Sequence, residues 1–288
     1  MTKTNRKLTD KQQAVLYILV SAFGFASMSM LVKLSGDLPV MQKSFFRNFI
    51  STFVALAAIR HSGGSLYVKK ENRMGVLARA AFGTVGMLCN YYALRYMILP
   101  DATILTKLSP FFTILYSFFL LKETVTKRQW MAITISFLGC VFVLQPSFSS
   151  GQLLPAMVAV IGGATTGIAY VYVRFLTQRG EEKNVIIFYF SLFSCLVSIP
   201  FMLAAFSPMS TFQVITLIGS GIAAAVGQFG MTNAYARAPG RFLGPFEYSQ
   251  LLFSAIYSYF IFGQVPTLVG LMGYGVILAV SLWMLKSE

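Results

Sequence analysis

The stretch TILTKLSPFFTILYSFFLL, residues 103–121, has the length and composition of a membrane-spanning helix, yet it contains Lys107. About 20 apolar residues cross the roughly 30 Å of hydrocarbon in a bilayer. A charge at membrane depth costs at least about 2.5 kcal/mol, so it marks either a functional site or a side chain that snorkels to the interface. Pro110 frees a backbone carbonyl near Thr106, which a membrane helix tolerates where it lines a cavity. The stretch therefore predicts a broken helix beside a polar cavity.

The rest of the chain has the same character. Of its 288 residues, 56% are hydrophobic, and the mean hydropathy is +0.69. The apolar residues fall in long runs without the alternation of a transmembrane barrel, so we expect a single all-α integral membrane domain over 1–288. Ten transmembrane helices are expected, at 13–33, 41–60, 75–95, 102–121, 128–145, 154–176, 185–206, 211–233, 244–262 and 266–285.

The positive charges alternate between the links. The net charge is +14, and Lys and Arg occupy the N-terminal tail, the C-terminus and the link after every even-numbered span. The links SFSSG (147–151) and SPMS (207–210) contain neither residue type. Cytoplasmic loops carry the excess of Lys and Arg, so we expect a multi-pass protein of the cell membrane with both termini in the cytoplasm. Loops that face the cytoplasmic surface of the lipid bilayer thus account for the positive net charge, and no nucleic-acid partner is expected.

The second half of the chain repeats the first. The segment that starts at Tyr92 aligns without a gap with the segment that starts at Asn233, and Tyr116-Ser117 falls on Tyr257-Ser258. Each unit contains five spans, an odd number, so the second unit enters the membrane from the opposite side. We therefore expect two inverted five-helix repeats, 13–145 and 154–285, an arrangement typical of secondary transporters.

Two charged residues inside the expected spans are the first site candidates. Glu247 is a carboxylate within the expected span 244–262, and the repeat offset places it at the level of Thr106, next to Lys107. The acid and the base could bind the two ends of one substrate, or pair with each other and lock the two halves together. Glu247 is also the candidate for coupling transport to protons.

Uncharged polar residues and one arginine within the spans extend this candidate substrate site. They are Asn90, Tyr91, Tyr170, Gln228, Tyr248, Gln250 and Arg47. Hydrogen bonding between helices is the alternative role for each amide or hydroxyl, and anchoring of the second span is the alternative for Arg47. The cysteines are isolated, so neither a metal site nor a cofactor is expected.

Several motifs resemble a known family. They are FFRN (45–48), YALRY (92–96), LSPFF (108–112), KETVTKRQW (122–130), FLGCVFVLQPS (137–147) and FGQVP (262–266). With them the chain resembles EamA-type members of the drug/metabolite transporter superfamily, although the glycine that usually precedes Glu123 is absent and Gln264 replaces the second glutamate. The resemblance implies a cavity lined by spans 1, 3, 4, 6, 8 and 9, with spans 5 and 10 at the side, and transport without ATP.

The expected function is secondary active transport of a small polar or zwitterionic, amino-acid-like metabolite by alternating access. The alternative is export of lipophilic or cationic drug-like compounds, held by an aromatic wall. A membrane enzyme would need metal ligands or a nucleophile–base pair, and the sole histidine, His61, lies in a link. A channel or a scaffold is the remaining class, and countertransport would exclude both.

Overall fold

The computed structural model describes residues 9–97, 99–146, 153–263 and 265–286. Gln264 and the link 147–151 lie outside the described residues. Within them the regular structure is helical, without strands. The first half contains α1 (Asp10–Leu34), α2 (Val40–His61), the 3-10 helix η1 (Lys70–Asn72), α3 (Arg73–Tyr96), α4 (Leu99–Thr106), α5 (Ser109–Leu121) and α6 (Lys127–Leu144). The second half contains α7 (Leu153–Gln178), α8 (Lys183–Ala204), α9 (Thr211–Arg237), α10 (Gly240–Glu247), α11 (Ser249–Phe262) and α12 (Leu268–Lys286).

Two of the expected transmembrane spans are each divided into two helices, one at the break that Pro110 indicated and one at a break that was not expected. The expected helix 102–121 is divided where α4 ends at Thr106 and α5 begins at Ser109. The expected helix 244–262 is divided at Tyr248, between α10 and α11. Pro110 lies in the first turn of α5 and removes a backbone donor, which explains the first break. α4 and α10 end at positions that the repeat offset makes equivalent.

Local capping sets the starts of three long helices. Thr9, Thr126 and Ser210 each accept a hydrogen bond from the backbone of a glutamine three residues later, and that glutamine returns a bond to the cap. These reciprocal capping boxes satisfy amide groups that a helix start leaves without partners. They begin α1, α6 and α9.

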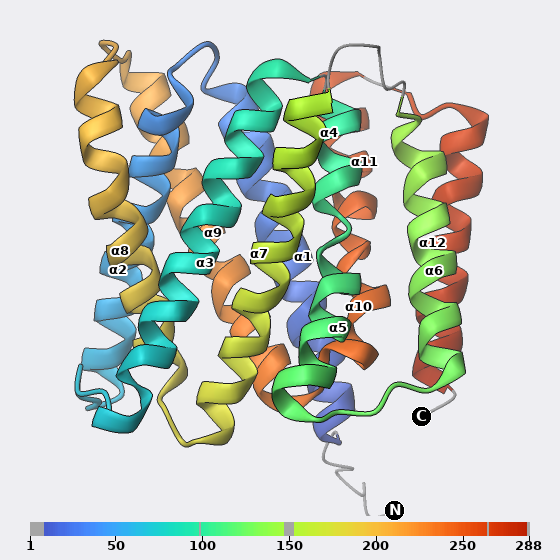
Figure 1. Ribbon diagram of the computed structural model, residues 1–288. Coiled ribbons are helices and arrows are strands. Elements are labelled where there is room, and N and C mark those ends of the chain that lie inside the picture. Colours follow the sequence, from blue (N-terminus) through green and yellow to red (C-terminus); the bar gives the residue numbers. More distant parts are fainter. Residues whose placement is uncertain (1–8, 98, 147–152, 264, 287–288) are drawn as a thin grey trace, which may run out of the picture.

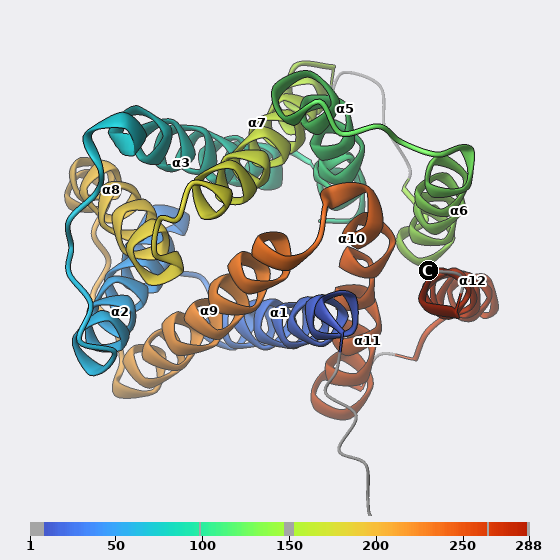
Figure 2. The same ribbon diagram turned by 90° about the horizontal axis from the view of Figure 1, so that it is seen from below.

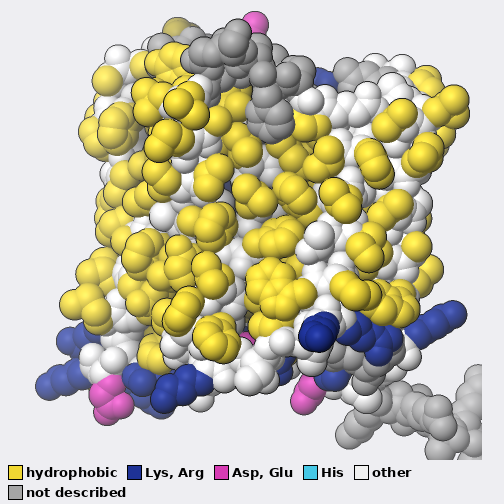
Figure 3. Space-filling model, turned by 45° about the vertical axis from the view of Figure 1, so that its right-hand side comes forward, with side chains coloured by type: hydrophobic (Ala, Val, Ile, Leu, Met, Phe, Trp, Pro, Cys, Tyr) yellow, Lys and Arg dark blue, Asp and Glu magenta, His cyan; other side chains and the backbone are white. Residues whose placement is uncertain are grey.

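Among the described residues, seven helical segments are long and apolar enough to cross a membrane. They are α1, residues 102–121 across the α4–α5 break, α6, α7, α8, α9 and α12. Figure 3 shows hydrophobic side chains covering the visible face, with Lys and Arg gathered along its lower edge. The chain is therefore a multi-pass membrane protein.

The two halves of the chain interleave rather than form separate bodies. α1 packs along α9, α2 along α8, α3 along α7, and α6 along α12. Both chain ends lie on the same side, and α1 and α7 start on opposite sides (Figure 1). Viewed along the helices, α6 and α12 stand at one side of the molecule (Figure 2). The remaining helices surround the centre of the structure.

Glycines bring α1 and α9 into backbone contact. A Cβ added at Gly24 would lie 2.5 Å from the Gly227 nitrogen, and one at Gly230 would lie 2.6 Å from the Ser21 nitrogen. Real Cβ atoms do not come this close to backbone atoms, so glycine is required at both positions. This contact places Ser21 of α1 beside Gln228 of α9 at the wall of the central cavity.

Candidate binding cavity

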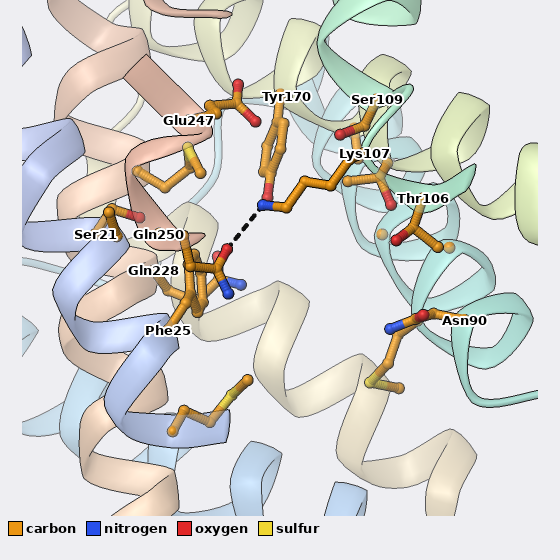
Figure 4. A pocket seen from close by; sticks show the side chains of 18 of the residues that line it. Ser21, Phe25, Asn90, Thr106, Lys107, Ser109, Tyr170, Gln228, Glu247 and Gln250 are labelled. Atoms are coloured by element: carbon orange, nitrogen blue, oxygen red, sulfur yellow. Dashed lines mark hydrogen bonds between the residues drawn. The ribbon is translucent and has the colours of Figure 1, made fainter. Parts of the chain in front are cut away.

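A cavity of about 330 Å³ lies between the two halves. Its lining comes from α1 to α5 and from α7 to α11, and Figure 4 shows it from close by. α6 and α12 pack beside it, as the family resemblance implies. α2 and α8 also reach the cavity, through Arg47 and Phe190, which the resemblance did not imply. Eight of the nine candidate residues line it: Arg47, Asn90, Tyr91, Lys107, Tyr170, Gln228, Glu247 and Gln250.

Lys107 lies in the break between α4 and α5 and extends across the cavity. Its ammonium donates to Gln250 Oε1 of α11 at 2.9 Å (Figure 4). The ninth candidate, Tyr248, is fully buried, and its hydroxyl donates to the Lys107 carbonyl at 3.0 Å. Tyr248 thus satisfies a carbonyl that the helix break frees, and it positions the lysine from outside the lining.

Glu247, the last residue of α10, is buried with 7% of its surface exposed. Its Oε1 accepts a hydrogen bond from the Tyr235 hydroxyl at 2.5 Å. Tyr235 in turn stacks on Tyr170, with ring centroids 5.2 Å apart and planes inclined by 25°. In this conformation the carboxylate binds Tyr235 and the Lys107 ammonium binds Gln250, so the direct hydrogen-bonded pair between the two charges is not formed.

Arg79 of α3 is a lining residue that the sequence reasoning missed. It is only 3% exposed, and its guanidinium carbon lies 4.2 Å from the centre of the Phe190 ring. Nη2 donates to Gln228 Oε1 at the long distance of 3.5 Å. The signal was present, because Arg79 is a charge inside the expected span 75–95, as Lys107 is in its span.

Other lining residues carry no signal in the sequence. Ser21, Phe25, Thr106 and Ser109 face the cavity beside the candidates (Figure 4). Hydroxyl and aromatic side chains are common throughout membrane helices, where they also pack between helices. Only the helix arrangement identifies which of them meet at the centre.

The charges of the lining are unequal. Three cationic side chains, Arg47, Arg79 and Lys107, and one carboxylate, Glu247, are among the described residues that form it. Charges in a cavity with low-dielectric walls act more strongly than charges in water. The cavity can therefore bind a small polar organic molecule, and its field favours anionic groups.

A polar network ties together the helix ends at one end of the molecule. Arg174 of α7 forms an ion pair with Glu123 of the α5–α6 link, at 2.6 Å between Nε and Oε1. The Arg174 Nη1 also donates to the Tyr235 carbonyl at 3.3 Å. Arg241 of α10 donates to the Thr124 carbonyl of the same link. The α5–α6 link is thereby held against α7 and α10.

Comparison with known proteins shows that the chain is similar to membrane transporters. Residues 12–145 match the EamA-like transporter family. The chain is 29% identical over 275 residues to the pseudopaline exporter CntI of Pseudomonas aeruginosa (strain UCBPP-PA14), with 94% of each protein covered. It is 26% identical over 247 residues to the S-adenosylmethionine uptake transporter of Rickettsia prowazekii (strain Madrid E), with 85% of this chain and 82% of that protein covered.

A solved crystal structure has the same fold. It is 16% identical in sequence and superposes with a TM-score of 0.82, over 94% of this chain and 97% of the other. At this identity the similarity concerns the helix arrangement alone. The arrangement described above is therefore one that a solved protein adopts.

Proposed function

We propose that this chain, whose residues 12–145 match the EamA-like transporter family, is a member of that family and a secondary active transporter of a small polar or zwitterionic, amino-acid-like metabolite. It is a transporter rather than an enzyme. One similar protein is named as an exporter and the other as an uptake transporter, and both names specify an organic small molecule. Movement of such a molecule is the activity that we assign to the cavity.

The observation that carries the proposal is the placement of two opposite charges in one cavity beside two helix breaks. Lys107 follows the end of α4, and Glu247 is the last residue of α10. An ammonium and a carboxylate that line the same cavity suit the carboxylate and the amino group of a zwitterion. The volume of about 330 Å³ falls in the range of small-molecule sites. Binding would exchange the Gln250 and Tyr235 contacts for contacts to substrate.

We propose that ten helices cross the membrane as two inverted repeats, 13–145 and 154–285. The order of helices in the second half repeats that in the first, including the broken fourth helix. α2 and α3 run beside α8 and α7, which are candidate spans, and this supports a transmembrane position for both. Alternating access would then be a rocking of the two halves about the cavity.

We place the Lys- and Arg-rich edge in Figure 3, with both termini, on the cytoplasmic side of the cell membrane. Arg174 and Glu123 lie toward this side. Their ion pair, with the Arg241 contact to the α5–α6 link, would close the cytoplasmic end in the conformation described. Opening that end requires the network to break.

A neutral lipophilic compound is the second candidate substrate. Phe25, Tyr91, Tyr170 and Phe190 line the cavity and would suit such a compound. A cationic drug-like compound is less well matched, because three of the four charged lining residues are themselves cationic. The aromatic wall and the charges together suit a zwitterion or an acid that also carries apolar groups.

Uptake of a radiolabelled panel into proteoliposomes, with and without an imposed proton gradient, tests the proposal. We expect an amino-acid-like compound to be taken up and to exchange with unlabelled compound inside. If Glu247 carries the coupling proton, Glu247→Gln should abolish accumulation driven by the gradient while exchange continues. Transport of lipophilic dyes with no uptake of any amino-acid-like compound would refute the proposed substrate class.

A further inference from the structure

We infer that Arg79 is the binding residue for a carboxylate of the transported molecule, and that the substrates are therefore organic acids with net negative charge. The inference rests on the proposed transport function and specifies its substrate class. It stands on four features of the cavity: the burial of Arg79, its lack of a counter-charge, the fixed orientation of its guanidinium, and the excess of cations around it.

Arg79 is a buried cation without an acidic partner. Its side chain is 3% exposed, its Nε has no hydrogen-bond partner within the described part of the chain, and Gln228 accepts from Nη2 only at 3.5 Å. A guanidinium offers five N–H donors, and a buried charge is normally paired and fully hydrogen-bonded. The sole carboxylate among the described lining residues, Glu247, is bound by Tyr235. We assign the missing acceptor to a carboxylate of the bound substrate.

The surroundings hold the guanidinium in one orientation. The Phe190 ring lies 4.2 Å from its central carbon, a contact that covers one face of the group. Gly83, one turn along α3, provides the space, because a Cβ added there would clash with Nη1 and would lie 2.7 Å from the Phe190 ring. With one face covered, the N–H edges remain for ligands. A carboxylate matches such an edge through two parallel hydrogen bonds.

In the part of the chain that the structure describes, Arg79 lacks the close protein acceptor that Lys107, another cation of the lining, has. The Lys107 ammonium has an acceptor in Gln250 at 2.9 Å and is a point charge without a preferred plane. Arg47 adds a further positive charge to the lining. When one substrate carboxylate pairs with Arg79, two cations remain among the described lining residues, Lys107 and Arg47, and Glu247 is their single negative counter-charge there. A substrate with more carboxylates than amino groups reduces this positive excess.

The test measures ligand-induced thermal stabilisation of the purified full-length protein. The probes are L-glutamate, L-phenylalanine and S-adenosylmethionine, each compared with its α-carboxamide. We expect L-glutamate, the probe with net negative charge, to stabilise the wild type more than L-phenylalanine, S-adenosylmethionine or its own amide does. Arg79→Gln should weaken binding of that acid by about 30-fold or more, since a buried charge-assisted pair is lost. Arg79→Lys retains the charge without the planar fork and should weaken it by about 10-fold.

Arg73→Gln is the matched control, because Arg73 begins the same helix, is exposed and does not line the cavity. Arg73→Gln also removes one positive charge, and it should leave the affinity for the acid and for its amide unchanged. The stability of the ligand-free protein supplies a second readout. Removing an unpaired buried guanidinium should keep or raise the melting temperature of Arg79→Gln, whereas a structural arginine would lower it.

The inference is overturned if L-glutamate stabilises the wild type no better than the neutral and cationic probes, if its amide stabilises it equally well, or if Arg79→Gln retains the preference for the acid. Transport assays of the same compounds distinguish failure of the Arg79 inference from failure of the proposed transport function. Uptake of amides equal to that of acids would leave the transporter proposal intact and refute the role of Arg79. Acid binding that depends on Arg79, without uptake or exchange of any probe, would retain the site and refute the transport proposal.

Discussion

Replacing Tyr235 by phenylalanine removes one oxygen atom from beside the cavity and keeps the ring. The hydroxyl donates to Glu247 Oε1 at 2.5 Å, and both residues are buried, with 1% and 7% exposure. The ring stacks on Tyr170 at 5.2 Å, and phenylalanine preserves that contact. The change therefore removes the hydrogen bond to the buried acid, together with the contact that the same hydroxyl makes with Thr113.

The expected cost follows from the charge on the acceptor. A hydrogen bond to an ionised group contributes about 1.5–3 kcal/mol, and one between neutral groups about 1 kcal/mol. We expect Tyr235→Phe to lower the free energy of unfolding by about 2 kcal/mol. In a Glu247→Gln background the same change should cost about 1 kcal/mol, because the acceptor is then neutral.

Reversible unfolding in mixed micelles, titrated with a denaturing detergent, measures these values. Tyr170→Phe is the matched control: it deletes the hydroxyl of the stacked neighbour, and we expect a change within about 0.5 kcal/mol. If Tyr235→Phe costs no more than Tyr170→Phe, the hydroxyl does not stabilise the buried carboxylate, and the account of how Glu247 is held is wrong. Equal costs in the wild-type and Glu247→Gln backgrounds would contradict a charged acceptor.

Three further changes test packing, closure and orientation. Gly24→Ala forces a methyl group to within 2.5 Å of the α9 backbone, so its melting temperature should fall, and an unchanged value would contradict the close contact. Glu123→Gln removes the ion pair with Arg174 that we propose closes the cytoplasmic end. A cysteine at Ser21 in the cavity should then react faster with a thiol reagent added from the cytoplasmic side, and an unchanged rate would contradict this role of the ion pair. In a protein without its native cysteines, cysteine at Ser65 should react with an impermeant thiol reagent only from inside and cysteine at Pro208 only from outside, and the reverse pattern would refute the orientation.

Much of the helix arrangement could be predicted from local patterns. The expected helix 41–60 is observed as Val40–His61, and 211–233 as Thr211–Arg237. Runs of apolar residues set the helices, and turn and capping residues set their ends. Pro110 indicated the break near Thr106, which the structure confirms. The break at Tyr248 was not predicted. The repeat offset could have indicated it, because Tyr248 is equivalent to Lys107, which lies in the first break.

The site was predictable only where a charge lies inside an apolar helix. Lys107 and Glu247 were found in this way, and Arg79 could have been found by the same argument. The repeat offset gave the level of each charge along the helix axis but not its rotation about that axis, so it did not show that Lys107 meets Gln250. Tyr235 is one of 14 tyrosines in the chain, and nothing local marks it as the partner of Glu247.

Countertransport by Lys107 variants tests most directly whether the central cavity is the transport site. Proteoliposomes preloaded with the unlabelled form of whichever amino-acid-like compound the uptake panel identifies would be assayed for exchange with its radiolabelled form. We predict that Lys107→Ala abolishes exchange while its melting temperature stays near that of the wild type, and that Lys107→Arg is impaired because its hydrogen-bond geometry differs. Lys70→Ala, at an exposed position in η1, should exchange normally. Normal exchange by both Lys107 variants would contradict the account.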